Sequence, residues 1–131
     1  VYSWGSGLFG QLGHGDKERR LTPPLIETLR DVKVSTVGAG GSWSLALTWC
    51  GAVYSWGCER LGYEADEDCQ CTPKLIEALQ GVKVVGLAAG GVHSVATSDA
   101  GKVWGWGNYA FLGLGLTQHL LVPLQYPNLR L

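Results

Sequence analysis

Four cysteines, three histidines and two runs of charged residues are the side chains of this sequence that could carry chemistry. The first two sets are Cys50, Cys58, Cys69, Cys71, His14, His93 and His119. Thiolates and imidazoles ligate metals or act as nucleophile and base when a fold gathers them. However, one residue separates Cys69 from Cys71, whereas paired zinc ligands usually have about two to four residues between them. The histidines have no recurring partner.

Other catalytic patterns are missing from the sequence. It contains no Ser, His and Asp arrangement, and Gly10–Gly15 is not followed by the Lys-Ser or Lys-Thr of a phosphate-binding loop. Four cysteines are too few for a disulfide framework, and none recurs at an equivalent position of another repeat, so we expect free thiols. We therefore predict no catalytic residue, no cofactor site and no metal site.

The charged runs are candidates for contact with a partner. The first contains Asp16, Lys17, Arg19 and Arg20, and the second contains Glu64, Asp66, Glu67 and Asp68. One interpretation is that both are solvated loops. The other is that the acidic run attracts a basic partner, whose association the charges would steer.

The composition narrows the class of partner. The chain has 131 residues and a net charge of -1, with 10 Lys and Arg against 11 Asp and Glu. This balance lacks the basic excess that neutralises phosphates, so we do not expect nucleic acid as a partner of this segment. No apolar run approaches the roughly 18 to 20 residues that span a bilayer. We expect a soluble intracellular protein, cytoplasmic or nuclear, without a membrane span.

An internal repeat organises these residues. Val1–Gly5 reads Val-Tyr-Ser-Trp-Gly, recurs at Val53–Gly57, and recurs in altered form at Val103–Gly107. Residues 72–101 match residues 22–51 at 15 of 30 positions. A period near 50 residues is typical of stacked supersecondary units. We divide the chain into repeat 1 (1–52), repeat 2 (53–102) and a partial repeat 3 (103–131).

The local patterns within each repeat are those of strands. Apolar residues alternate at Val32 and Val34 and at Leu45 and Leu47, and the aromatic runs fit a pleated surface packed on both faces. Glycine at 51 and 101 suits a hairpin turn. The paired glycines at 40–41 and 90–91 would let neighbouring backbones approach closely.

The segment at residues 24–29, repeated at 74–79, is ambiguous between a fourth strand and one helical turn. The preceding Thr-Pro pairs favour an edge strand that begins there. Four strands per repeat describe a propeller blade. We expect the recurring tryptophans, Trp4, Trp56 and Trp106, to lie in the core. The repeated structural positions are Trp4, Gly5, Gly40, Gly41, Trp56, Gly57, Gly90, Gly91, His93, Trp106 and Gly107.

These blocks resemble the regulator of chromosome condensation (RCC-type) repeat family. They are Val-Tyr-Ser-Trp-Gly, then Gly10–Asp16, then Pro-x-x-Ile-Glu-x-Leu, then Val-x-x-Val-x-Ala-Gly-Gly, and together they cover essentially the whole chain. The resemblance implies an all-β fold with four-stranded antiparallel blades, of which this chain would supply about two and a half of seven. An open piece exposes strand edges, which we expect further blades or another chain to complete.

The same resemblance implies a function based on surfaces. We expect a noncatalytic protein-protein interaction scaffold, part of a larger protein or assembly. The alternative is guanine nucleotide exchange on a Ran-like small GTPase, as the founding member of the family performs. A chromatin-associated regulator is the third hypothesis. Repeats 2 and 3 have shortened loops in place of Gly10–Asp16, so roles that depend on loop residues do not transfer by resemblance.

Overall fold

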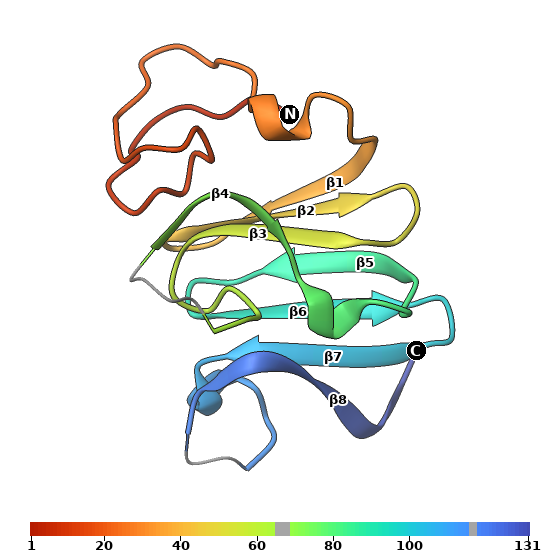
Figure 1. Ribbon diagram of the computed structural model, residues 1–131. Helices are drawn as coiled ribbons and strands as arrows, with labels where there is room; N and C mark the ends of the chain where they lie inside the picture. Colours follow the sequence, from red (N-terminus) through yellow and green to blue (C-terminus); the bar gives the residue numbers. More distant parts are fainter. Residues whose placement is uncertain (65–68, 116–117) are drawn as a thin grey trace.

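The computed structural model describes residues 1–64, 69–115 and 118–131, and shows two four-stranded antiparallel sheets stacked face to face (Figure 1). The first sheet contains β1 (Val34–Ala39), β2 (Trp43–Thr48), β3 (Val53–Cys58) and β4 (Cys69–Leu75) in sequence order. The second contains β5 (Val84–Ala89), β6 (His93–Ser98), β7 (Lys102–Gly107) and β8 (Leu120–Arg130). This arrangement confirms the all-β prediction of four-stranded antiparallel blades.

Each sheet joins two successive sequence repeats. Strands β1 and β2 come from residues 34–48, whereas β3 and β4 come from residues 53–75. The chain begins with a further pair of short segments, bridged antiparallel at Tyr2 with Leu25 and at Gly5 with Arg20. They correspond in sequence to β3 and β4, and we call residues 1–25 the half-blade. The structure is thus a half-blade followed by two complete blades.

The alternating side chains bury both faces of the first sheet. Trp43, Leu45 and Leu47 face the second sheet, where they share one hydrophobic cluster with Trp106 and Ala96. On the other face, Ala46 and Trp56 pack with Ile26 and Leu29 in a second cluster. Because both faces of β2 are covered, all but its second residue, Ser44, are buried.

The glycine predictions are confirmed at the turns. Gly51 and Gly101 have φ of 89° and 77°, values that residues with a side chain rarely adopt. Between the blades, a Cβ placed on Gly41 would lie 2.8 Å from the carbonyl oxygen of Gly91. The absence of a side chain at Gly41 therefore allows the turns of the two sheets to pack directly against each other.

The segments at residues 24–29 and 74–79, for which a strand and a helical turn were the alternatives, contain the end of a strand followed by a helical turn. In the first sheet β4 begins at Cys69, before Thr72, and ends at Leu75, and the 3-10 helix η2 (Glu77–Leu79) follows. The first copy is similar, since Leu25 bridges to Tyr2 and η1 (Glu27–Leu29) follows. A third 3-10 helix, η3, spans Tyr109–Phe111. Buried Leu29 and Leu79 anchor the first two turns against the sheets.

Two expectations are not met. Cys58 and Cys69 form a disulfide, since they lie opposite each other in the β3–β4 register, whereas Cys50 and Cys71 are free as expected. Trp56 and Trp106 are 2% and 0% exposed, but Trp4 is 63% exposed. The reason is positional: the counterparts of Trp4 pack on a preceding blade, and no described residue covers the outer face of the half-blade.

Candidate functional site

The connections between the third and fourth strands project from one end of the stacked blades. Their described residues are 6–19 in the half-blade, 59–64 after β3, and 108–115 and 118–119 between β7 and β8, on the left in Figure 1. The turns at 40–42 and 90–92 lie at the same end. We call this end the loop face. It contains the first charged run and Glu64 of the second.

An ion pair shapes the first loop. The Arg20 guanidinium donates to both carboxylate oxygens of Asp16, at 2.8 and 3.2 Å, and also to the Glu18 carbonyl oxygen at 3.3 Å. The Glu18 amide donates to Asp16 at 3.0 Å. Together, chiefly through the Arg20 bond, they hold the pKa of Asp16 below its ordinary value. Asp16 and Arg20 therefore fold the loop rather than presenting free charges.

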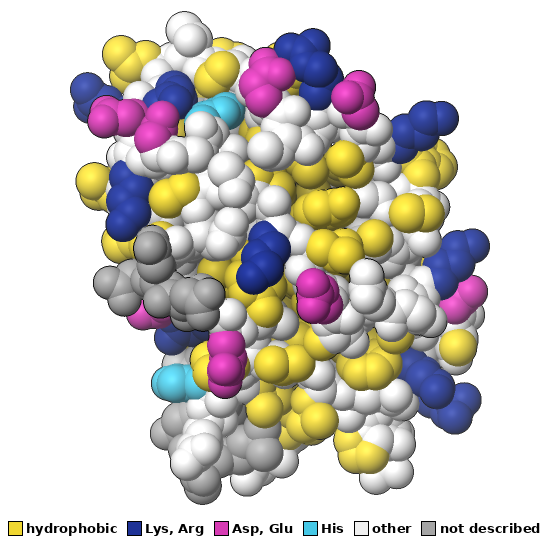
Figure 2. All heavy atoms as spheres, in the orientation of Figure 1, with side chains coloured by type: hydrophobic (Ala, Val, Ile, Leu, Met, Phe, Trp, Pro, Cys, Tyr) yellow, Lys and Arg dark blue, Asp and Glu magenta, His cyan; other side chains and the backbone are white. Residues whose placement is uncertain are grey.

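Other side chains of the first loop are open to a partner. Lys17 and Arg19 are exposed and form no hydrogen bond or ion pair with the part of the chain that the structure describes. Leu8 and Phe9, in the same loop, are 70% and 46% exposed. Figure 2 shows charged and hydrophobic side chains interspersed at the upper left, where this loop lies. Such a mixture is typical of protein contact surfaces.

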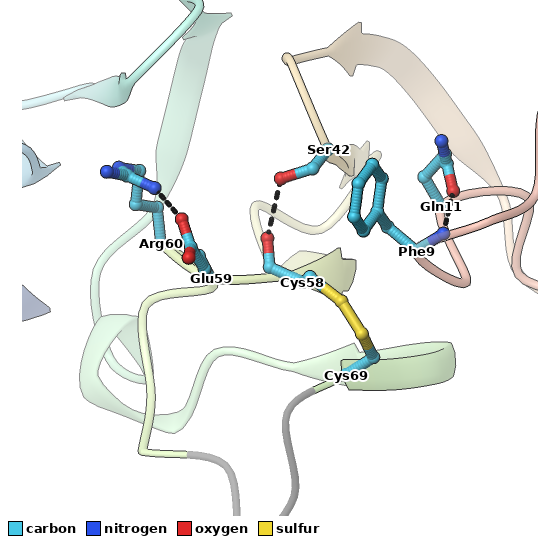
Figure 3. Close-up of a disulfide and its surroundings, with 7 residues drawn as sticks. All are labelled: Phe9, Gln11, Ser42, Cys58, Glu59, Arg60 and Cys69. Atoms are coloured by element: carbon cyan, nitrogen blue, oxygen red, sulfur yellow. Dashed lines mark hydrogen bonds and ion pairs between the residues drawn. A yellow bond between two sulfur atoms is a disulfide. The ribbon is translucent and has the colours of Figure 1, made fainter.

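The second loop starts at the disulfide. Cys58 ends β3, and Glu59 and Arg60, which form an ion pair, follow with φ of 57° and 48°. Figure 3 shows this corner, where the Ser42 hydroxyl donates to the Cys58 carbonyl oxygen at 3.0 Å. Phe9 and Gln11 in the same view come from the first loop. The first loop also reaches β4 beside this corner, since the Gly15 amide donates to the Cys71 carbonyl oxygen at 2.9 Å.

The roots of the loops are fixed by hydrogen bonds to buried side chains. Ser3 donates to the Leu12 carbonyl oxygen at 2.5 Å, and Ser55 donates to that of Leu61 at 2.5 Å. In addition, the indole of Trp56 donates to the Gln11 carbonyl oxygen at 2.7 Å, and that of Trp106 to the Arg60 carbonyl oxygen at 3.2 Å. The first two loops are thus each tied to their own blade and to the next one.

The His93 position, one of the repeated structural positions, carries an aromatic ring in both sheets. Trp43, its counterpart in the first sheet, donates from its indole to Ser94 Oγ at 3.1 Å across the blade interface. His93 instead stacks on Phe111, with ring centroids 6.1 Å apart. Its Nδ1 is buried and has no hydrogen-bond partner among the described residues. His93 lies on the outer face of the second sheet and contributes to packing.

The structure brings some of the predicted contact residues together. Asp16, Lys17 and Arg19 share one loop, Arg20 follows directly after it, and exposed Glu64 lies in the neighbouring loop. Asp66, Glu67 and Asp68 fall outside the described residues. Sequence reasoning missed Leu8 and Phe9, although two large apolar residues between glycines in a loop are a signal of exposure. Across residues 1–64, 69–115 and 118–131, no cluster of three His, Cys, Asp or Glu side chains could hold a metal.

Comparison with known proteins agrees with this geometry. The family model described as the regulator of chromosome condensation (RCC1) repeat matches residues 1–47 and 51–97. The human E3 ubiquitin-protein ligase HERC2 is 47% identical over 70 residues, which are 51% of this chain and 1% of that protein. Rat alsin is 50% identical over 62 residues, which are 47% of this chain and 4% of alsin. The chain thus spans a small part of these relatives.

Solved structures show the same fold over nearly the full chain. Prp20p from Saccharomyces cerevisiae superposes with a TM-score of 0.81 at 31% identity, covering 96% of this chain and 34% of Prp20p. Human WBSCR16 superposes with a TM-score of 0.79 at 28% identity, covering 96% of this chain and 34% of WBSCR16. No helix within the described residues is long and apolar enough to cross a membrane. The repeats, the paired blades and the matching family model together place this chain in the regulator of chromosome condensation (RCC1) repeat family.

Proposed function

We propose that this chain is part of a noncatalytic protein-protein interaction scaffold. The observation that carries the proposal is the construction of the first loop. Its root is fixed by Ser3 and Trp56, while its tip exposes Leu8, Phe9, Lys17 and Arg19. A loop whose ends are already fixed, and whose exposed side chains are both charged and apolar, can bind a partner with little loss of conformational entropy. In this proposal the repeats are the units 1–52, 53–102 and 103–131, and further blades or another chain complete the open edges.

The loop face offers two kinds of charge to a partner. Lys17 and Arg19 favour an acidic patch on the partner, whereas exposed Glu64 favours a basic one. Asp66, Glu67 and Asp68, which follow Glu64 in the sequence, would add to the negative charge. Asp16 and Arg20 hold the first loop in shape. A partner that matches both loops would carry an acidic and a basic patch, which gives orientation as well as attraction.

A charge-reversal pair tests this surface. The experiment compares the proteins captured by the parent chain with those captured by the Lys17→Glu/Arg19→Glu variant, and measures the amount of each. The matched control is Lys33→Glu/Lys83→Glu, which reverses two exposed lysines that precede the first strands of the sheets, at the opposite end. Partners of the loop face should be lost in the first variant and retained in the control. Equal capture by all three proteins would contradict the proposal.

Guanine nucleotide exchange on a Ran-like small GTPase is the second candidate. The observation that favours it is the likeness to Prp20p, which is described with binding properties to Gsp1p and histones. An exchange factor needs a surface that prefers the nucleotide-free GTPase. Release of labelled GDP from Gsp1p above the intrinsic rate, in the presence of this chain, is the expected result for this candidate. Release at the intrinsic rate would reject it for the chain as it exists.

A chromatin-associated role is the third candidate, and the same relative supports it because Prp20p is described with histones. The net charge of -1 favours basic histone proteins over DNA as the contact. Binding to histone octamers without DNA, abolished by moderate salt, is the expected result. Binding to free DNA of equal strength would contradict this form of the candidate.

We place the scaffold inside the cell, in the cytoplasm or nucleus, with the support of the same histone-binding relative. The Cys58–Cys69 disulfide bears directly on this location, because reducing compartments keep most thiols free. Rapid alkylation of the chain at the moment of cell lysis, followed by mass measurement, distinguishes the two cases. Four alkylated cysteines indicate a reducing compartment, and two indicate an oxidising one.

A further inference from the structure

A pocket lies between the two complete blades, at their outer strands. It has a volume of about 370 Å³, within the range of about 300 to 1,000 Å³ that is usual for small-ligand sites. Both walls come from complete sheets, because η2, which follows β4, contacts β8 of the second sheet (Figure 1). We call this the rim pocket, and its lining includes Tyr63, Glu64, Lys74, Glu77, Ala78 and Val122.

The rim pocket holds a cation against an aromatic ring. The Tyr63 ring is half-buried, and its hydroxyl donates to the Ser55 carbonyl oxygen at 3.0 Å, which fixes its position. The Lys74 ammonium lies 4.6 Å from the centroid of that ring. A cation in this position is attracted by the negative face of the ring. The pocket therefore suits a positively charged group with an apolar stem, and exposed Val122 adds apolar area.

The charges that line the rim pocket do not balance. Glu64 and Glu77 are exposed carboxylates, whereas Lys74 is the one cation among the described lining residues. Neither carboxylate forms a hydrogen bond or an ion pair with the described part of the chain. One further cation would therefore neutralise the site, and charge complementarity of this kind selects a partner.

The first repeat shows which cation a glutamate at this position binds. Glu27 is the counterpart of Glu77 at the offset of 50 residues, and the Arg30 guanidinium donates to both of its carboxylate oxygens at 2.9 Å. The counterpart of Arg30 is Gln80, which carries no charge. The second repeat therefore has the glutamate without the arginine. A guanidinium from outside the chain would restore the pairing that the first repeat makes internally.

We propose that the rim pocket binds an arginine side chain of a partner protein. The guanidinium donates to the Glu77 carboxylate, as Arg30 does to Glu27, and Glu64 supplies a second negative charge in the same pocket. The aliphatic stem of the arginine covers Val122. This inference rests on the proposed interaction scaffold, and it names the chemistry of one contact.

Arginine suits this pocket better than lysine for two reasons. Its planar guanidinium can donate two parallel hydrogen bonds to one carboxylate, and it is less strongly hydrated than an ammonium. In addition, the face of the Tyr63 ring already holds the ammonium of Lys74, so a second ammonium would gain little there.

Three short peptides test the proposal on the intact chain. The probe is acetyl-Leu-Arg-Leu-amide, and its matched control contains citrulline, which has the shape of arginine but no charge. The third peptide contains lysine in place of arginine. NMR titration follows the backbone amide signals of Gly62 and Glu77, both of which line the pocket.

Three protein variants separate the rim pocket from other acidic surface. Glu77→Gln removes the carboxylate that receives the guanidinium. Its matched control, Glu27→Gln, removes the counterpart that already pairs with Arg30. Gln80→Arg supplies the missing arginine from within the chain, so that Glu77 is occupied before the probe binds.

The arginine peptide should bind saturably, and both control peptides should bind more weakly, the citrulline peptide by about tenfold or more because its N–H groups carry no charge. Glu77→Gln and Gln80→Arg should each weaken binding about three- to fivefold, as expected for an exposed ion pair, while Glu27→Gln should bind as the parent does. Equal binding of the arginine peptide and either control peptide, or equal binding by the parent and Glu77→Gln, would overturn the proposal. The loop-face capture experiment depends on Lys17 and Arg19, which lie outside the rim pocket, so failure here is distinct from failure of the scaffold proposal.

Discussion

The hydroxyl of Tyr126 donates a hydrogen bond to the carbonyl oxygen of Leu112 at 2.5 Å. In the two preceding repeats a serine makes this contact, from Ser3 to Leu12 and from Ser55 to Leu61. The third repeat has Gly105 at the serine position, and a Cβ there would lie 2.8 Å from the Tyr126 ring. In the third repeat, a tyrosine of the fourth strand therefore makes the hydrogen bond to the loop carbonyl oxygen that a serine of the third strand makes in the other two repeats.

This replacement predicts that the effect of Gly105→Ser on the free energy of unfolding changes sign when Tyr126 is removed. Gly105→Ser alone should destabilise the chain, because its Cβ meets the Tyr126 ring. Tyr126→Ala should cost about 2 kcal/mol through lost packing and the lost hydrogen bond. In the Tyr126→Ala background, Gly105→Ser should stabilise, because its hydroxyl regains the Leu112 carbonyl oxygen. Denaturant unfolding measures all four free energies, and additive effects would contradict this account.

Two residues at the start of the second loop have positive φ, so a substitution by glycine at the first of them should stabilise the fold. Glu59 has φ of 57°, a conformation that costs a residue with a side chain about 1 kcal/mol relative to glycine. Glu59→Gly should therefore raise the free energy of unfolding by about 0.5 to 1 kcal/mol, although it removes an exposed ion pair. The matched control is Glu27→Gly, which also removes an exposed ion pair, with Arg30, but from the 3-10 helix η1. The control should be destabilised.

The disulfide predicts a redox-dependent stability. Cys58 and Cys69 are 11 residues apart, and closing a loop of this size stabilises a fold by about 2 to 3 kcal/mol in the chain-entropy model. Reduction with a dithiol should lower the free energy of unfolding by that amount, as should Cys58→Ser/Cys69→Ser. Cys71→Ser, which removes a free thiol from the same strand, should retain the full effect of reduction. Equal stability of reduced and oxidised parent would contradict the prediction.

Tyr63 predicts a loss of stability at alkaline pH. Burial raises its pKa from 10.0 to about 12, so the folded state favours the neutral phenol. The unfolded chain ionises first, and the free energy of unfolding should fall as pH rises from about 10 to about 12. Tyr63→Phe cannot ionise, and its stability should decline less across this window. Parallel pH curves for parent and variant would show that Tyr63 does not contribute.

The sequence predicts the blades well because their signals recur. The aromatic runs and the paired glycines each appear in successive repeats, so local strand preference and the repeat period agree. The tryptophan expectation held for Trp56 and Trp106 and failed for Trp4, since burial depends on the neighbouring blade and not on the residue. The fourth strand began earlier than the Thr-Pro pairs suggested, because Cys69 and Gln70 pair with the end of β3.

The candidate site was less accessible to sequence reasoning. Lys17 and Arg19 were identified by charge, but the ion pair that holds Asp16 with Arg20 depends on the path of the loop. The disulfide joins cysteines that are unique to one repeat, so no periodicity points to it. Likewise, the exchange of Ser for Tyr126 involves residues far apart in sequence, and such compensation is visible in three dimensions alone.

The construction of each sheet from two successive repeats has a genetic consequence. Recombination can remove or add about 50 residues between equivalent points of two repeats. One such pair of points is the turn between β2 and β3 and the turn between β6 and β7. The product joins the first two strands of one sheet to the last two strands of a homologous sheet. The new sheet keeps its antiparallel register, because both parents pair a serine with a tryptophan at that seam. Genes of this type can therefore lengthen or shorten by whole blades while every sheet at the junction remains intact.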